Sequence, residues 1–233
     1  MSDTLTQAGI TAIERARSAW LQGIVEPRKV GENMLSAQWI DSIIRTEAGL
    51  DWGWLPRHET FDDFEWCGAF AAHCWTSVDL DIRRMYFSST ARLDAWARYA
   101  PMFGTTAEKK LMARFPKPAD AQLVRKRLVL TEDSTPAQVT AFGPREGDIL
   151  IVGAAGSKMG THITIVERWD AARGVFLTIE GNARGRLGAS GFEGRQGVVR
   201  QERKVGLAPG EPRKNYHARR IIRPSVLDMA VTK

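Results

Sequence analysis

The chain has 233 residues, of which 43% are apolar and 26% are charged, so its composition is that of a globular protein with an apolar core rather than a disordered chain. Its two cysteines are too few for a disulfide scaffold, and no apolar run reaches the roughly 18 residues that a transmembrane helix needs. Lys and Arg outnumber Asp and Glu by 33 to 27, and the resulting net charge of +6 indicates an anionic partner only weakly.

Helices are predicted throughout the first half of the chain. Apolar residues recur at helical spacing over 10–24 and over 33–48, which indicates two amphipathic helices. A third apolar stripe runs from Cys67 to Val78 and indicates a largely buried helix, and a fourth helix is expected over 89–99.

The third predicted helix carries both cysteines of the chain. Asp62 or Asp63 is expected to cap its start, which places Cys67 near its N-terminal end. Seven helical residues separate Cys67 from Cys74 by about 10.5 Å along the axis, so the two thiols cannot form a disulfide with each other.

The second half of the chain is predicted to form a sheet. Residues 104–145 mix basic clusters with prolines, and we expect an excursion at about 104–142 that includes a helix over 119–128. After Gly147 the pattern changes to short apolar and alternating segments. Strands are predicted over 148–152, 162–168, 175–180, 197–203 and 217–223. Helices followed by strands indicate an α+β fold, and we expect one domain over 1–224 with a flexible tail over 225–233.

Cys67 admits two interpretations. Cysteine is among the most buried residue types, and the apolar stripe favours a place in the core. A thiol at the N-terminus of a helix, however, meets the positive end of the helix dipole, which favours the reactive thiolate. Cys74 has only the apolar stripe in its favour, so we expect it to be a core residue.

Three polar residues could complete a site around Cys67. His162 opens a predicted strand and is the candidate base. Glu180 and Asn182 end the next strand, and residues two apart share a face, so both could address one point and hold a histidine ring in the required tautomer. Each feature alone also has a structural explanation: a hydrogen-bonded histidine at a strand start, or a Gly-Asn turn. No cluster has zinc-ligand spacing, so neither a metal nor a cofactor is expected.

In combination, the order of these residues resembles the CHAP family (cysteine, histidine-dependent amidohydrolases/peptidases) of papain-like cysteine hydrolases. The matching stretches are EWCGAFAAHCW at 65–75, YFSSTAR at 86–92, REGDILI at 145–151, THITIV at 161–166 and TIEGN at 178–182. The resemblance covers roughly residues 33–183, interrupted by the excursion. The chain departs from the family pattern in that basic excursion and in having no recognisable cell-wall-binding repeat.

The resemblance implies a papain-like fold, with the nucleophile at a helix N-terminus and the helices packed on an antiparallel sheet. It implies Cys67 as nucleophile, His162 as general base and then acid, Glu180 as the group that orients the imidazole, and Asn182 as a supporting polar group.

The activity implied by this resemblance is hydrolysis of amide bonds in peptidoglycan, as an endopeptidase or an N-acetylmuramoyl-L-alanine amidase. The start of the chain has no recognisable secretory signal. We therefore expect a protein made in the cytoplasm, such as a phage lysin, a tail-associated lytic enzyme or an exported antibacterial effector, that acts at the cell wall after lysis or export. Two alternatives stay open: a cysteine peptidase or amidase on a protein or small amide, and a non-enzymatic basic binding module in which Cys67 is a core residue.

Charge and aromatic residues suggest how a polymer could bind. Basic segments at 109–127 and 200–223 are either solvated faces or a surface for an anionic polymer such as the cell wall. Asp62 and Asp63 could hold an ammonium group of a stem peptide, and Trp54 and Trp66 could line a groove for sugar or peptide. No motif for binding nucleic acid is present, membrane insertion is not expected, and the sequence identifies no immunity or delivery partner.

Overall fold

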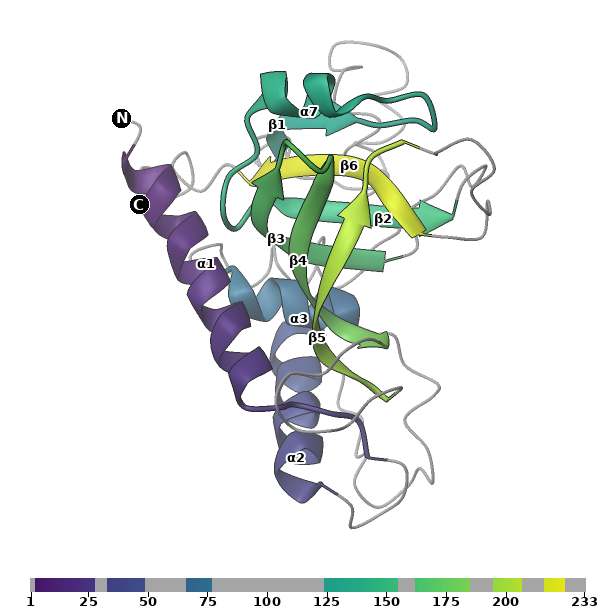
Figure 1. Ribbon diagram of the computed structural model, residues 1–233. Coiled ribbons are helices and arrows are strands. Elements are labelled where there is room, and N and C mark those ends of the chain that lie inside the picture. The colour runs from purple at the N-terminus through teal and green to yellow at the C-terminus, as the bar shows by residue number, and fades with distance from the viewer. Residues whose placement is uncertain are drawn as a thin grey trace, which may run out of the picture.

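A computed structural model describes residues 3–27, 33–48, 66–76, 124–154, 162–184, 195–206 and 216–224. In these ranges the chain forms helices followed by an antiparallel sheet, so the fold class is α+β (Figure 1). The helix predicted over 89–99, the caps Asp62 and Asp63, and the tail over 225–233 lie outside the described residues.

The first two predicted helices are confirmed. Helix α1 spans Asp3–Leu21, and α2 spans Met34–Ile43 before continuing as one π-helical turn, η1, over Ile44–Ala48. Helix α3 spans Cys67–Cys74 with Trp66 as its N-cap, so Cys67 lies at the N-terminal end as expected, whereas the cap is neither Asp62 nor Asp63. The described part of α3 ends before Val78, at Cys74.

Six strands form one sheet. They are β1 (Val124–Val129), β2 (Ile149–Ala154), β3 (His162–Asp170), β4 (Val175–Arg184), β5 (Gln196–Lys204) and β6 (Tyr216–Pro224). The order is β1-β6-β2-β3-β4-β5, and every neighbouring pair is antiparallel. Strands β2 to β5 therefore form a meander, and β6 returns to lie beside β2. The segment after α1 extends the β5 edge through a bridge between Val25 and Gly197.

Each face of the sheet has its own apolar cluster, because side chains alternate along a strand. Ile149 and Ile151 of β2 belong to a cluster with α1, α2 and α3. Leu150 and Val152 of the same strand belong to a second cluster with helix α7 (Pro136–Phe142). Figure 1 shows α7 and α2 on opposite sides of the strongly curled sheet, with α3 between the sheet and α2.

The prediction of a helix over 119–128 is wrong for its described part, because Val124–Val129 is strand β1 and pairs with β6. This pairing partner lies 91 to 100 residues further along the chain, from Val129↔Arg220 to Val124↔Pro224, so local patterning does not reveal it. The described end of the expected excursion, residues 124–142, is likewise built into the main fold. It supplies an edge strand and helix α7, whose Val139 is fully buried.

Helix α7 begins with a capping box, formed by Thr135 at the N-cap position and Gln138 three residues later. Thr135 Oγ1 accepts a hydrogen bond from the Gln138 N–H, the Gln138 side chain accepts one from the Thr135 N–H, and Pro136 takes the first helical position. Among the described helices, none is both long enough and apolar enough to cross a membrane.

Candidate active site

Strand β4 lies directly against the first turns of α3. Ile179 and Gly181 face α3, and a Cβ on Gly181 would lie only 2.5 Å from the Cβ of Phe70 and 2.7 Å from the ring of Trp66. Only glycine fits at this approach. By alternation, Thr178 and Glu180 point to the other face of the strand, as the sequence predicts for Glu180.

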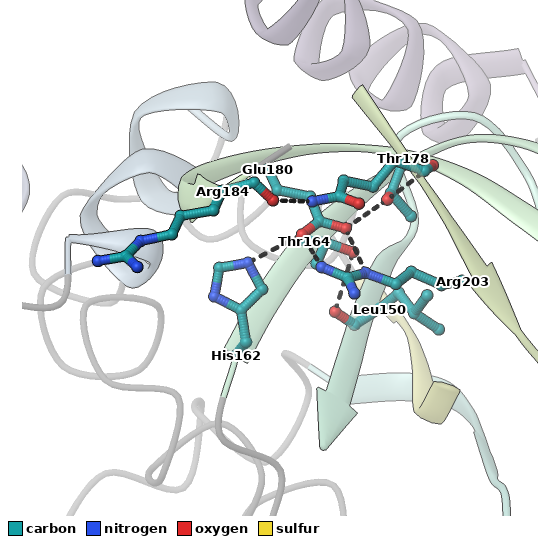
Figure 2. A network of polar contacts seen from close by, with 8 residues as sticks. Leu150, His162, Thr164, Thr178, Glu180, Arg184 and Arg203 are labelled. Carbon is teal, nitrogen blue, oxygen red and sulfur yellow. Dashed lines mark hydrogen bonds and ion pairs between the residues drawn. The ribbon is translucent and has the colours of Figure 1, made fainter. Parts of the chain in front are cut away.

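Cys67 and His162 meet at the start of α3. Cys67 is the first residue of that helix and only 2% exposed, and His162 is the first residue of β3. His162 Nε2 lies 3.1 Å from Glu180 Oε2, which leaves Nδ1 for the thiol. The two ends of the imidazole are thus held by a carboxylate and by Cys67 (Figure 2 shows the carboxylate side).

The surroundings of His162 favour its protonated form. Burial alone would lower the pKa of His162, but the charge of the Cys67 thiolate, its hydrogen bond and the contact with Glu180 together raise the pKa to about 10. At neutral pH the imidazole of His162 therefore favours its protonated, charged form, and a cation beside a cysteine favours the thiolate, which is the nucleophilic form.

Glu180 is completely buried and fully occupied by hydrogen bonds (Figure 2). Thr178 Oγ1 donates to its Oε1 at 2.6 Å, Arg203 Nε donates to Oε1 at 2.7 Å, and Arg203 Nη2 donates to Oε2, the oxygen that also faces His162. Burial would raise the pKa of Glu180, but the contacts with His162 and Arg203 outweigh it and lower the pKa to about 2. The carboxylate therefore stays ionised.

Asn182 does not contact the residue that Glu180 contacts: Glu180 binds His162, whereas Asn182 binds Trp66 and Glu26. The β4–β5 register shifts between Glu180 and Ala183, and Asn182 adopts a left-handed φ of 56°, so the simple alternation that we expected breaks at this bulge. Oriented so that its hydrogen bonds are satisfied, the Asn182 amide accepts from the Trp66 N–H at 3.2 Å and donates to Glu26 Oε1 at 2.8 Å. Asn182 thus holds the backbone N–H of Trp66, the residue that precedes Cys67.

The expectation that Trp66 lines a substrate groove is wrong. Its side chain is fully buried, packs edge-on against Trp39 and Phe70 at centroid distances of 6.5 Å and 6.3 Å, and donates its indole N–H to Glu26. Trp66 supports α3 from within and has no surface to offer a ligand. The other expected substrate-binding residues, Trp54, Asp62 and Asp63, lie outside the described residues.

Four of the arginines described in the basic segment 200–223 form ion pairs with carboxylates of the fold. The pairs are Arg200 with Glu167, Arg203 with Glu180, Arg219 with Glu132, and Arg223 with Asp148. Arg223 is bidentate to a carboxylate that is 3% exposed. For these four residues the expected polymer-binding surface is not supported, since their guanidinium groups already face carboxylates.

Three residues that the sequence analysis did not single out contribute to this site: Thr178, Arg203 and Glu26. Thr178 could have been found, because it lies two residues before Glu180 on the same face of one strand. Arg203 and Glu26 could not, because they reach the site from β5 and from the segment after α1.

Cys74 lies at the far end of α3 from Cys67, and neither cysteine is in a disulfide. Cys74 is 1% exposed, and burial raises the pKa of its thiol, which confirms the prediction of a core residue.

Within the described ranges, no group of three or more His, Cys, Asp and Glu side chains is arranged to hold a metal ion. In comparisons with known proteins, no family model, no curated protein and no solved structure matches this chain.

Proposed function

We propose that this protein is a cysteine hydrolase that cleaves amide bonds of the peptidoglycan stem peptide. The observation that carries the proposal is the placement of Cys67 at the first position of α3, beside a His162 whose far nitrogen is held by the buried Glu180. Nucleophile, base and orienting acid are the three parts that acyl transfer through a thioester requires.

In the first half of the proposed reaction, the Cys67 thiolate attacks the carbonyl carbon of the amide. The negative charge moves to the carbonyl oxygen, which would be stabilised by N–H groups at the start of α3, including that of Cys67. The His162 imidazolium then gives its proton to the leaving nitrogen, the C–N bond breaks, and the amine departs. The acyl group remains on Cys67 as a thioester, and His162 is neutral.

In the second half, neutral His162 takes a proton from water, whose oxygen attacks the thioester carbonyl. The C–S bond breaks, the carboxylic acid leaves, and the thiolate and the imidazolium are restored. Glu180 holds His162 through Nε2 and stabilises each imidazolium state by its charge, without taking up a proton itself.

The choice of peptidoglycan rests on the resemblance of residues 65–75, 145–151 and 178–182 to the CHAP family, a papain-like family. The α+β order of helices and antiparallel strands is compatible with that fold. Because peptidoglycan lies outside the cytoplasmic membrane, an enzyme with this substrate acts there after export or after lysis. Arg200, Arg203, Arg219 and Arg223 of β5 and β6 are already paired with carboxylates, so recognition of the wall would fall to other residues.

Two other functions are compatible with the same site geometry. A peptidase or amidase acting on a protein or a small amide would share all three residues and differ only in substrate. A binding module without catalysis is favoured by the burial of Cys67, which is 2% exposed, whereas the His162 side chain beside it is 13% exposed. In the catalytic proposal a substrate reaches the thiol past this exposed edge of His162.

Mass spectrometry of fragments released from purified peptidoglycan tests the proposal and identifies the bond cut. Wild-type protein should release muropeptides with new amine and carboxyl ends, and Cys67→Ala should release none. Cys74→Ala is the matched control, since it removes the other thiol of the same helix and should leave release intact. Activity on casein or small amides without release from peptidoglycan would favour the second function. Release that persists in Cys67→Ala would exclude Cys67 as the nucleophile.

A further inference from the structure

Arg203 forms the most complete contact that the buried carboxylate of Glu180 makes. Its Nε and Nη2 each donate to a different oxygen of Glu180, and its own side chain is 14% exposed. Arg203 belongs to β5 and lies opposite Phe176 of the neighbouring strand β4. Because Glu180 lies opposite Val199 instead, the side chain of Arg203 must run diagonally along the β4–β5 pair to reach Glu180. A guanidinium that binds both oxygens fixes the rotation of a carboxylate as well as its charge.

We infer that Arg203 is a positioning residue of the site, which keeps Glu180 ionised and turned so that Oε2 faces His162 Nε2. The inference rests on the proposed function, since it assigns Arg203 a part in the Cys67, His162 and Glu180 arrangement. Arg203 acts through Glu180 and His162 and does not itself contact the thiol or the substrate.

The need for such a residue follows from the burial of Glu180. A carboxyl group without exposed surface favours its neutral form unless a cation lies beside it. Thr178 orients Oε1 by a hydrogen bond but brings no charge. His162 is charged in only part of the reaction, because it gives up its proton when the amine leaves. Arg203 is charged throughout, so it holds the carboxylate in the intervals when His162 is neutral.

The same arrangement determines in which direction the loss of Arg203 shifts the pH dependence of Cys67 reactivity. Among the described residues, the charged or titratable groups around Glu180 are His162 from β3, Arg203 from β5 and, through His162, Cys67 from α3. Removing the cation at Arg203 raises the proton affinity of every one of the others. In a plot of the alkylation rate of Cys67 against pH, the acid limb must therefore move to higher pH, while the basic limb must not move to lower pH.

A merely structural arginine gives a different result. Its loss would lower stability, and with it the rate at every pH, without moving the acid limb. The position of the limb therefore separates a positioning role from a structural one.

The variants are Arg203→Met, Arg203→Lys and, as a matched control, Arg173→Met. Arg173 is also bidentate to a glutamate of β5, Glu202, but lies on the surface. Two readouts are measured against pH: the alkylation rate of Cys67 by iodoacetamide, and the carboxyl titration of Glu180 by ¹³C NMR, assigned with Glu180→Gln.

In Arg203→Met we expect the acid limb and the Glu180 titration both to move up by at least about one pH unit. Arg203→Lys keeps a charge but loses the two-point contact, so its shift should be smaller, and it keeps the test usable if the methionine variant does not fold. Arg173→Met should leave both readouts unchanged. An acid limb that stays at its wild-type position in both Arg203 variants, or a Glu180 titration that does so, would overturn the inference.

The two proposals fail in distinguishable ways. If wild-type Cys67 reacts no faster than an ordinary thiol, the proposed function fails, and the NMR titration still reports whether Arg203 controls the charge of Glu180. If Cys67 is reactive but the titration does not respond to Arg203, only the inference about Arg203 fails.

Discussion

Gly181→Ala tests the contact that fixes the site geometry. The new methyl group would lie 2.5 Å and 2.6 Å from Cβ and Cγ of Phe70 and 2.7 Å from the ring of Trp66. Carbon atoms in a protein interior pack at about 3.5–4.0 Å, so β4 and α3 would have to separate by about 1 Å. Overpacking of this kind costs about 1–3 kcal/mol of folding free energy.

The same shift separates the two halves of the site, because Cys67 lies on α3 and Glu180 on β4. A misplacement of about 1 Å can cost about 100-fold in rate. We therefore expect Gly181→Ala to lower the free energy of unfolding by about 1–3 kcal/mol and the reactivity of Cys67 by one to two orders of magnitude. Urea unfolding measures the first, and the second-order rate of alkylation at pH 7 measures the second.

Gly143→Ala is the matched control. Gly143 follows α7 with φ +68°, and nothing lies within 4 Å of the position a Cβ would take. The variant should lose about 1–2 kcal/mol through the left-handed backbone alone and keep the reactivity of Cys67. The reasoning is refuted if Gly181→Ala keeps wild-type stability and reactivity, or if both variants lose reactivity in proportion to their loss of stability.

The remaining predictions concern charge. Glu180→Gln keeps the shape of the side chain but removes its charge, so the pKa of His162 should fall from about 10 by about one to three units, seen as a lower basic limb of the alkylation profile; an unmoved limb would contradict this. Because the folded-state pKa of His162 is raised above its ordinary value of 6.5, its contribution to stability is present below pH 6.5 and is lost as pH rises toward 10, so urea unfolding should show a decline over this range that His162→Gln removes. The opposite sign holds for Glu180, whose lowered pKa gives stability that is lost as pH falls from about 4.5 through about 2, a decline that Glu180→Gln should flatten. Arg223→Met leaves Asp148 buried without its bidentate partner and should cost about 3–5 kcal/mol in urea unfolding, whereas the exposed Arg173→Met should change little; equal effects of the two would contradict the buried pairing.

Local patterning predicted most of the described elements. The apolar stripes gave α1, α2 and the start of α3, and the alternating segments gave five of the six strands, because both signals arise from residues a few positions apart. Strand β1 was mistaken for a helix because its evidence is a pairing with β6, far along the chain. Charged residues such as Arg125 and Lys126 do not by themselves indicate a helix or a strand, because the preference for a strand depends on the pairing partner.

The candidate site divides in the same way. The sequence identified Cys67, His162 and Glu180, and the structure brings their side chains together. It misplaced Asn182, because a bulge and a left-handed φ interrupt the alternation of β4. It also read the basic segment 200–223 as a surface, because nothing in the sequence says which carboxylate each arginine will face.

The central claim is that Cys67 is an activated thiol, and its rate of alkylation tests that claim most directly. Peptide mass spectrometry after brief exposure to iodoacetamide compares Cys67 with Cys74, a buried thiol of raised pKa in the same helix. The account predicts that Cys67 is labelled far faster than Cys74, with a bell-shaped pH profile that disappears in His162→Ala. Equal and slow labelling of both cysteines, or labelling of Cys67 that does not depend on His162, would contradict it.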